Sequence, residues 1–185
     1  MDIVAPAVAE AVRADEVRAA GFVAGCAERM AQLFTGSRGP DEARGADLDL
    51  FVRAMDALWT DDTTAADFGA FGDAVERLPE LASDDDDPPV DSSDIAATLA
   101  VIALVHATRY RATGDAEEAL ACGHVCLTAM ALIDQNTPAS HLREDEDGYQ
   151  SRDIEPEETD PARRRAAARE ISRARLAVVF SSARE

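Results

Sequence analysis

The chain has 185 residues and a formal net charge of −19, and all 18 residues counted as Lys or Arg are arginines. Such a charge repels other polyanions, so direct binding of nucleic acid is not expected. The length fits one domain that buries a hydrophobic core. Alanine supplies much of the apolar 46 %, whereas aromatic residues reach only 5 %. This composition favours close packing of helices over a β-sandwich.

Three explanations of the acidity and of the missing lysine stay open from the sequence. A GC-rich codon supply raises the content of Ala, Arg, Gly and Asp together. Adaptation of the surface to high salt gives a similar composition. A basic protein partner is the third explanation, because complementary charge steers the encounter of two proteins.

The first half of the chain predicts three amphipathic helices. Apolar residues recur at three- and four-residue spacing over 8–33, and the glycines and proline of 36–40 end that helix. Similar spacing predicts helices over 47–59 and 64–78. The stretch 83–91 holds four consecutive aspartates and two prolines, so we expect an acidic loop. A calcium loop is not predicted, because its spaced ligands, glycine and closing glutamate are missing.

The second half predicts a central hairpin and a basic helix. Residues 95–112 and 116–133 are strongly apolar, and their short connection favours an antiparallel pair. The acidic stretch 136–160 has no helical periodicity, so a surface loop is expected. Residues 162–181 form a basic helix that docks its apolar stripe on the acidic body. The predicted fold of residues 1–185 is therefore a single all-α domain, a bundle of about six helices with a central antiparallel apolar hairpin.

Two sets of residues are expected to face the core. In the hairpin they are Ile95, Leu99, Ile102, Leu120, Leu127 and Met130. In the C-terminal helix they are Ala167, Ile171, Ala174 and Val178, with Leu176, Val179 and Phe180 widening the stripe. Arginines elsewhere on that helix would steer it toward the acidic body.

Several short runs resemble the bacterial YjaG-like proteins, a family of compact all-helical proteins of unknown function. They are the run Gly-Phe-Val-Ala-Gly-Cys-Ala-Glu-Arg-Met at 21–30, Phe34, and the run Met-Asp-Ala-Leu-Trp at 55–59. The resemblance extends over roughly residues 20–135. It implies a helical fold, and it implies no reaction, cofactor or catalytic residue.

Four charged or titratable residues form a candidate polar cluster: Glu28, Arg29, Asp56 and His106. Asp56 and Arg29 each neighbour apolar positions of a predicted helix, and a charge near a core is normally paired. We therefore expect an Arg29–Asp56 ion pair. The alternative is a small enzyme that uses the same four residues in a polar pocket of the bundle. No phosphate loop, metalloprotease motif or nucleophile elbow accompanies them, so no catalytic residue is predicted.

The three cysteines, Cys26, Cys122 and Cys126, lie in apolar helical patterns, which predicts buried reduced thiols. Cys122 and Cys126 are four residues apart, and His106 on the neighbouring helix would complete a metal corner. Zinc sites more often take paired cysteines from a tight turn, and a fourth ligand is missing here. We therefore expect no bound metal and no cofactor.

The predicted function is binding of another protein in the cytoplasm. The first ten residues lack the basic start of a signal peptide, and the apolar stretch 95–107 is too short to span a bilayer, so no membrane association is expected. The partner would be a basic protein, with this chain as regulator, adaptor or acidic neutralising partner, as in an immunity protein or DNA mimic. The sequence leaves the oligomeric state open.

Overall fold

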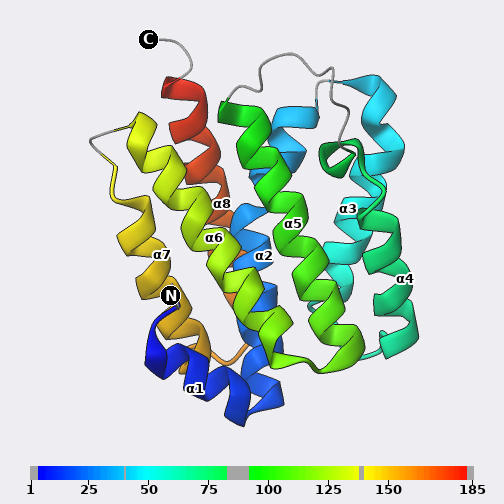
Figure 1. Ribbon diagram of the computed structural model, residues 1–185, viewed down its shortest axis with the longest axis vertical. Helices are drawn as coiled ribbons and strands as arrows, with labels where there is room; N and C mark the ends of the chain where they lie inside the picture. Colours follow the sequence, from blue (N-terminus) through cyan, green and yellow to red (C-terminus); the bar gives the residue numbers. More distant parts are fainter. Residues whose placement is uncertain (1–3, 40, 83–91, 138–139, 183–185) are drawn as a thin grey trace.

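A computed structural model describes residues 4–39, 41–82, 92–137 and 140–182. These residues form an all-α bundle, as predicted, with eight α-helices instead of six, two 3₁₀-helices and no strand (Figure 1). The elements are α1 (Pro6–Ala14), α2 (Glu16–Arg38), η1 (Glu42–Arg44), α3 (Gly45–Ala57), α4 (Ala65–Val75), η2 (Pro79–Leu81), α5 (Ser92–Thr113), α6 (Ala116–Asn136), α7 (Leu142–Ile154) and α8 (Pro161–Ser182). The predicted acidic loop, 83–91, lies outside the described residues.

The long first helix of the prediction is two helices that meet at Asp15. The backbone of Asp15 is extended (φ −145°, ψ 109°), and the Asp15 side chain accepts hydrogen bonds from the backbone N–H groups of Val17 and Arg18. An aspartate in this position satisfies the free N–H groups of a helix start. The apolar periodicity continues through Asp15, so it hides the change of direction between α1 and α2.

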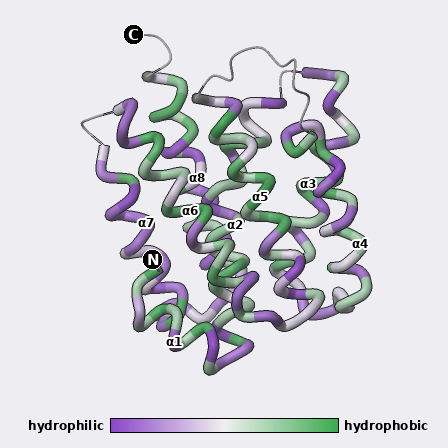
Figure 2. Tube along the Cα trace, viewed as in Figure 1, coloured by the Kyte–Doolittle hydropathy of each residue, from purple (hydrophilic) through white to green (hydrophobic). Residues whose placement is uncertain are grey.

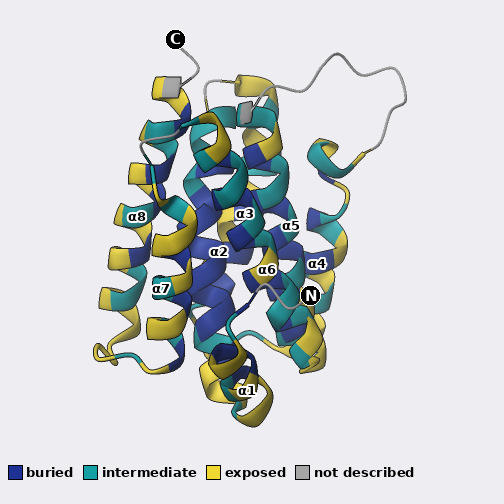
Figure 3. Ribbon diagram, turned by 60° about the vertical axis from the view of Figure 1, so that its left-hand side comes forward, coloured by how far each residue is buried: buried dark blue, intermediate teal, exposed yellow. Residues whose placement is uncertain are grey.

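α2 runs through the middle of the bundle and contacts α1, α3, α5, α6, α7 and α8. Figure 3 shows this helix buried along most of its length. Its small residues permit this packing. At Gly25 an added Cβ would lie 2.6 Å from Asp153 Oδ2, and at Gly36 it would overlap Leu176. Helix α2 is therefore the element against which the other helices assemble.

α5 and α6 are joined by Gly114 and Asp115 and pack against each other. Gly114 has φ +72°, a conformation that glycine adopts without strain, and Asp115 caps α6 by accepting from the N–H of Glu117. The pair shares the core with α2, which packs closely on α5. α6 alone is long and apolar enough to cross a membrane among the described residues, yet core helices of soluble proteins pass the same test.

The prediction of which hairpin residues are buried was right for Leu127 and Met130 only. Ile95 is 41 % exposed, and Leu99, Ile102 and Leu120 are partly buried. The face of α5 that packs inward is instead made mostly of small residues; it comprises Ala96, Ala97, Ala100, Val101, Ala103, Leu104 and Ala107. Because α5 is apolar on nearly every side, periodicity cannot tell which side meets the core.

The prediction of a surface loop over 136–160 was wrong, because α7 occupies Leu142–Ile154. Asp134, near the end of α6, starts this helix by accepting hydrogen bonds from the N–H groups of Leu142 and Arg143. Figure 2 shows α7 as hydrophilic over much of its length. Two of its three buried residues, Glu146 and Gln150, are polar. A helix whose inward face is polar gives no hydrophobic periodicity to detect.

α8 extends over Pro161–Ser182, close to the predicted 162–181. Its buried residues are Ala168, Ser172, Arg175 and Val179. The predicted stripe of Ala167, Ile171, Ala174 and Val178 was therefore displaced by about one residue. Of the residues expected to widen it, Val179 is buried, Leu176 is partly buried and Phe180 is exposed. Arg175 accounts for the difference. The apolar pattern predicts that this residue is exposed, whereas its side chain lies in the core.

Candidate functional site

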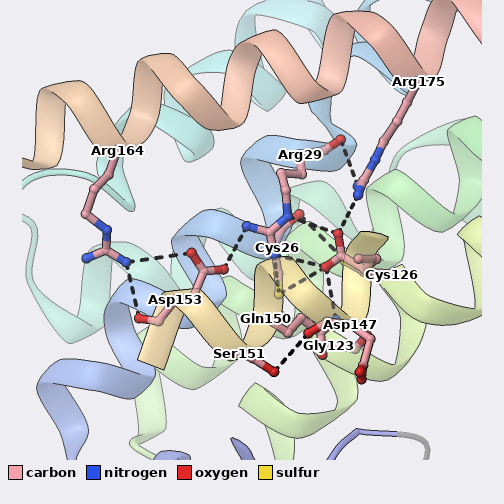
Figure 4. Close-up of polar contacts among 11 residues, drawn as sticks. Cys26, Arg29, Gly123, Cys126, Asp147, Gln150, Ser151, Asp153, Arg164 and Arg175 are labelled. Carbon is pink, nitrogen blue, oxygen red and sulfur yellow. Dashed lines mark hydrogen bonds and ion pairs between the residues drawn. The ribbon is translucent and has the colours of Figure 1, made fainter. Parts of the chain in front are cut away.

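The carboxylate of Glu146 on α7 is fully buried. Arg29 donates to both of its oxygens, each at 2.9 Å, and Arg175 donates to Oε2. Gln150 donates to Oε1 at 3.0 Å. The side chains of Glu146, Arg29 and Arg175 are at most 3 % exposed. Figure 4 shows the side chains of Arg29 from α2 and Arg175 from α8 extending toward each other.

The charges of the two arginines hold Glu146 ionised. Burial by itself raises the pKa of a carboxyl, but Arg29 and Arg175 more than offset that effect and lower the pKa of Glu146 from 4.5 to about 2. Asp153, one helical turn beyond Gln150, also pairs with Arg29, at 2.7 Å. There burial dominates over the attraction of Arg29, and the pKa of Asp153 is raised.

Glu28 is the centre of a second ion cluster. Its oxygens accept from Arg165 and Arg169 of α8, each at 2.9 Å, and from the indole N–H of Trp59 at 2.9 Å. Its side chain is 4 % exposed. Asp56 contacts the same two arginines at 2.5 and 3.9 Å. Helix α8 is therefore fixed to α2 and α3 by shared arginines.

A third buried glutamate, Glu80 in η2, holds two arginines at the other end of α2. Arg38 donates to Oε1 at 2.8 Å and Arg44 to Oε2 at 2.7 Å, and the side chain of Glu80 is 2 % exposed. Burial alone raises the pKa of Glu80, whereas its bonds to Arg44 and Arg38 lower it, and the pKa falls below its ordinary value. In the part of the chain that the structure describes, one arrangement thus occurs three times, a glutamate with a buried side chain between two arginines.

The four residues of the predicted polar cluster do not meet in one place. Glu28 and Asp56 belong to one cluster, and Arg29 belongs to the Glu146 cluster. His106 lies apart, with Nδ1 2.6 Å from Glu118 Oε2. The predicted Arg29–Asp56 pair is wrong, because Arg29 pairs with residues of α7.

A groove of about 430 Å³ lies between α2, α7 and α8. Arg29 is the one residue of the predicted cluster that lines this groove. The other lining residues include the aromatic and charged side chains of Trp59, Tyr149, Arg152 and Arg164. Arg152 lies over the ring of Tyr149, 4.7 Å from its centre. Acids and arginines alternate along its walls, and the groove brings together neither a nucleophile with a base nor a pair of free carboxylates.

The three cysteines do meet. Their sulfur atoms lie within 4.8 Å of one another, and all three side chains are fully buried. The sequence had suggested His106 as the third possible metal ligand beside Cys122 and Cys126. In the structure Cys26, and not His106, lies beside these two cysteines. Burial raises the pKa of the Cys26 thiol well above its ordinary value, so a nucleophilic role is disfavoured. Three sulfurs so placed are also potential ligands for one soft metal ion.

Sequence reasoning missed Glu146, Asp153 and Arg175, the residues that pair with or join Arg29. A signal was present in Arg175, an arginine flanked by alanine and leucine in an otherwise mixed helix. No family model, curated protein or solved structure matches this chain. The resemblance to YjaG-like proteins therefore stays a prediction, and function has to be argued from the geometry alone.

Proposed function

We propose that this protein acts by binding a basic protein partner in the cytoplasm, as a regulator, adaptor or acidic neutralising partner, and not by catalysis. The observation that carries the proposal is where its arginines lie. Glu28, Glu80 and Glu146, whose side chains are at most 4 % exposed, each engage two arginines. Six arginines are thereby held in ion pairs within the fold, although Arg169 is itself 45 % exposed, and many carboxylates remain exposed at the surface.

The edge formed by α3, α4 and their connection is the surface that suits such a partner best. It presents the exposed carboxylates of Asp49, Asp61, Asp62 and Asp73, with the apolar side chain of Val52, 44 % exposed, on the same elements. Asp73 lies near the C-terminal end of α4, where a negative charge opposes the helix dipole. Because Asp73 costs stability and has no role inside the fold, its presence is consistent with recognition of a partner protein.

The acids of α7 have a simpler structural role. Glu144 and Asp145 lie in the first turn of that helix, where negative charge is favourable. They are exposed, as are Asp147 and Glu155. This second set of four acids therefore offers a matched control of equal charge.

The test compares two fourfold variants as bait for proteins from the native lysate at low salt. One carries D49N, D61N, D62N and D73N, and the other carries E144Q, D145N, D147N and E155Q. We expect the wild type and the α7 variant to retain one basic protein that elutes as salt rises, since salt screens exposed charges. We expect the α3–α4 variant to lose it.

Equal loss from both variants would mean that the acidic surface adsorbs basic proteins without a specific site. Equal retention by both would remove α3–α4 as the binding edge. Retention of duplex DNA by the wild type at physiological salt would contradict the choice of a protein partner, because polyanions should be repelled.

A further inference from the structure

Cys26 of α2 and Cys122 and Cys126 of α6 converge because of how the two helices pack. Cys122 and Cys126 are four residues apart on one helix, so their side chains leave the same face. Gly123 lies between them, and a Cβ there would be 2.6 Å from the ring of Phe22. Only a glycine allows α2 to approach so closely, and this approach brings Cys26 to the two thiols of α6.

We propose that the three cysteines bind one soft monovalent metal ion, copper(I), through three sulfur ligands. Thiolate sulfur is the donor that copper(I) prefers. A metal–sulfur bond of about 2.3 Å places three sulfurs around a planar three-coordinate ion about 4.0 Å apart. The sulfurs already lie within 4.8 Å of one another. These separations are close to those of such a site, so we expect small side-chain adjustments to suffice for binding.

Arg29 is the cationic group next to the cluster. Copper(I) with three thiolates carries a net charge of −2. Beside it, Arg29 pairs with Glu146 and Asp153, and Arg175 pairs with Glu146, so these four groups balance formally. Arg29 Nη2 lies 3.5 Å from Cys26 Sγ, the kind of outer contact that orients and stabilises a metal ligand.

The donor set fits copper(I) better than zinc. Structural zinc sites take four ligands in tetrahedral geometry, and the described residues that group here are the three cysteines. His106 does not group with the cysteines; its Nδ1 lies 2.6 Å from Glu118 Oε2. Both oxygens of Glu146 are occupied by donors from Arg29, Arg175 and Gln150.

The first test is an anaerobic titration of the reduced full-length protein with copper(I), in competition with a chromogenic copper(I) chelator. We expect one ion per chain. X-ray absorption of the loaded protein should give three sulfur neighbours at about 2.3 Å. This measurement needs no variant, so it tests the proposal even if cysteine substitutions unfold the chain.

The second test compares C122S with M130L, a control that replaces another fully buried sulfur-containing residue of α6. C122S should weaken copper(I) binding more than about a hundredfold, because even outer partners of a ligand contribute 10–100-fold. M130L should leave the affinity unchanged, and circular dichroism should confirm that both variants stay helical.

Three results would overturn the proposal. One is that the wild type loses all copper(I) to the chelator. Another is that bound copper has fewer than three sulfur neighbours. The third is that zinc binds with one ion per chain in competition with copper(I). None of these results bears on the binding of a basic partner, so the two proposals fail independently.

Discussion

Arg175 of α8 donates to the carboxylate of Glu146 of α7 in the core, where the two side chains are 2 % and 0 % exposed. Neither helix has a strong apolar stripe, and this contact connects them to each other and, through Arg29, to α2. A buried ion pair adds little to stability relative to well-packed apolar residues. Removing one partner is different, because a buried charge then remains uncompensated.

Loss of Arg175 should therefore be severe. We expect R175M to lower the free energy of unfolding by about 3–5 kcal/mol, measured by urea denaturation at neutral pH. R173M, at an exposed position two residues earlier on the same helix, should change it by less than about 0.5 kcal/mol. Similar losses in both variants would show that helix propensity or net charge, and not the buried contact, causes the effect.

The low pKa of Glu146 makes part of the stability depend on pH. The folded pKa of about 2 lies below the ordinary value of 4.5, so ionisation of this group favours the folded state. Its contribution, about 3 kcal/mol from 1.36 kcal/mol per pKa unit, is fully present above pH 4.5 and is lost as pH falls toward 2. The stability difference between wild type and E146Q should shrink over that range in urea melts.

The contribution of Asp153 to stability should depend on pH with the opposite sign. Its folded pKa is raised above 3.8, so ionisation opposes folding, and its stabilising contribution is lost as pH rises above that value. We expect D153N to gain stability relative to wild type between about pH 4 and neutral. A parallel pH dependence of D153N and E146Q would contradict both assignments.

Two glycines, each in the interior of a helix, separate the effect of packing from that of helix propensity. Alanine at Gly25 would place its Cβ 2.6 Å from Asp153 Oδ2, a group held by Arg29, and we expect G25A to cost about 1–3 kcal/mol. Gly148 on α7 has no neighbour within 4 Å of an added Cβ, so G148A should stabilise by about 0.4–1 kcal/mol. Thermal denaturation of both variants measures these two changes in stability.

The inward side of α5 is tested by two large-to-small substitutions. Leu104 is fully buried and Ile95 is 41 % exposed. L104A should cost about 2–5 kcal/mol, and I95A should cost much less because little apolar surface returns to water. A larger loss for I95A would show that the end of α5 near Val179 is packed more tightly than its exposure indicates.

The sequence predicted the helical class, the start of α6 and the place of α8, because alanine-rich apolar patterns and capping residues report local structure. It did not predict α7, since the inward face of that helix is Glu146 and Gln150. It also misplaced the inward side of α8 by about one residue. In both helices the buried positions are chosen by ion pairs between distant segments, and hydrophobic periodicity carries no information about them.

The candidate site was predicted in part. The sequence singled out Glu28 and Arg29 as charges beside a core, and both are buried and paired. Their partners come from α7 and α8, more than a hundred residues later in the chain. With one sequence, no local rule identifies which of many arginines and acids meet. The cysteine cluster was missed for the same reason, because Cys26 lies far from Cys122.

The position of α8 in the chain sets an order of events during synthesis. α2 emerges early with Glu28 and Arg29 on its surface, and α7 brings Glu146 later. Arg165, Arg169 and Arg175 come last. Until they arrive, the growing chain has carboxylates in its centre without their full set of counter-charges, so water must solvate them and the helices around them cannot close. The nascent chain should therefore stay open to chaperones and proteases until α8 has been translated.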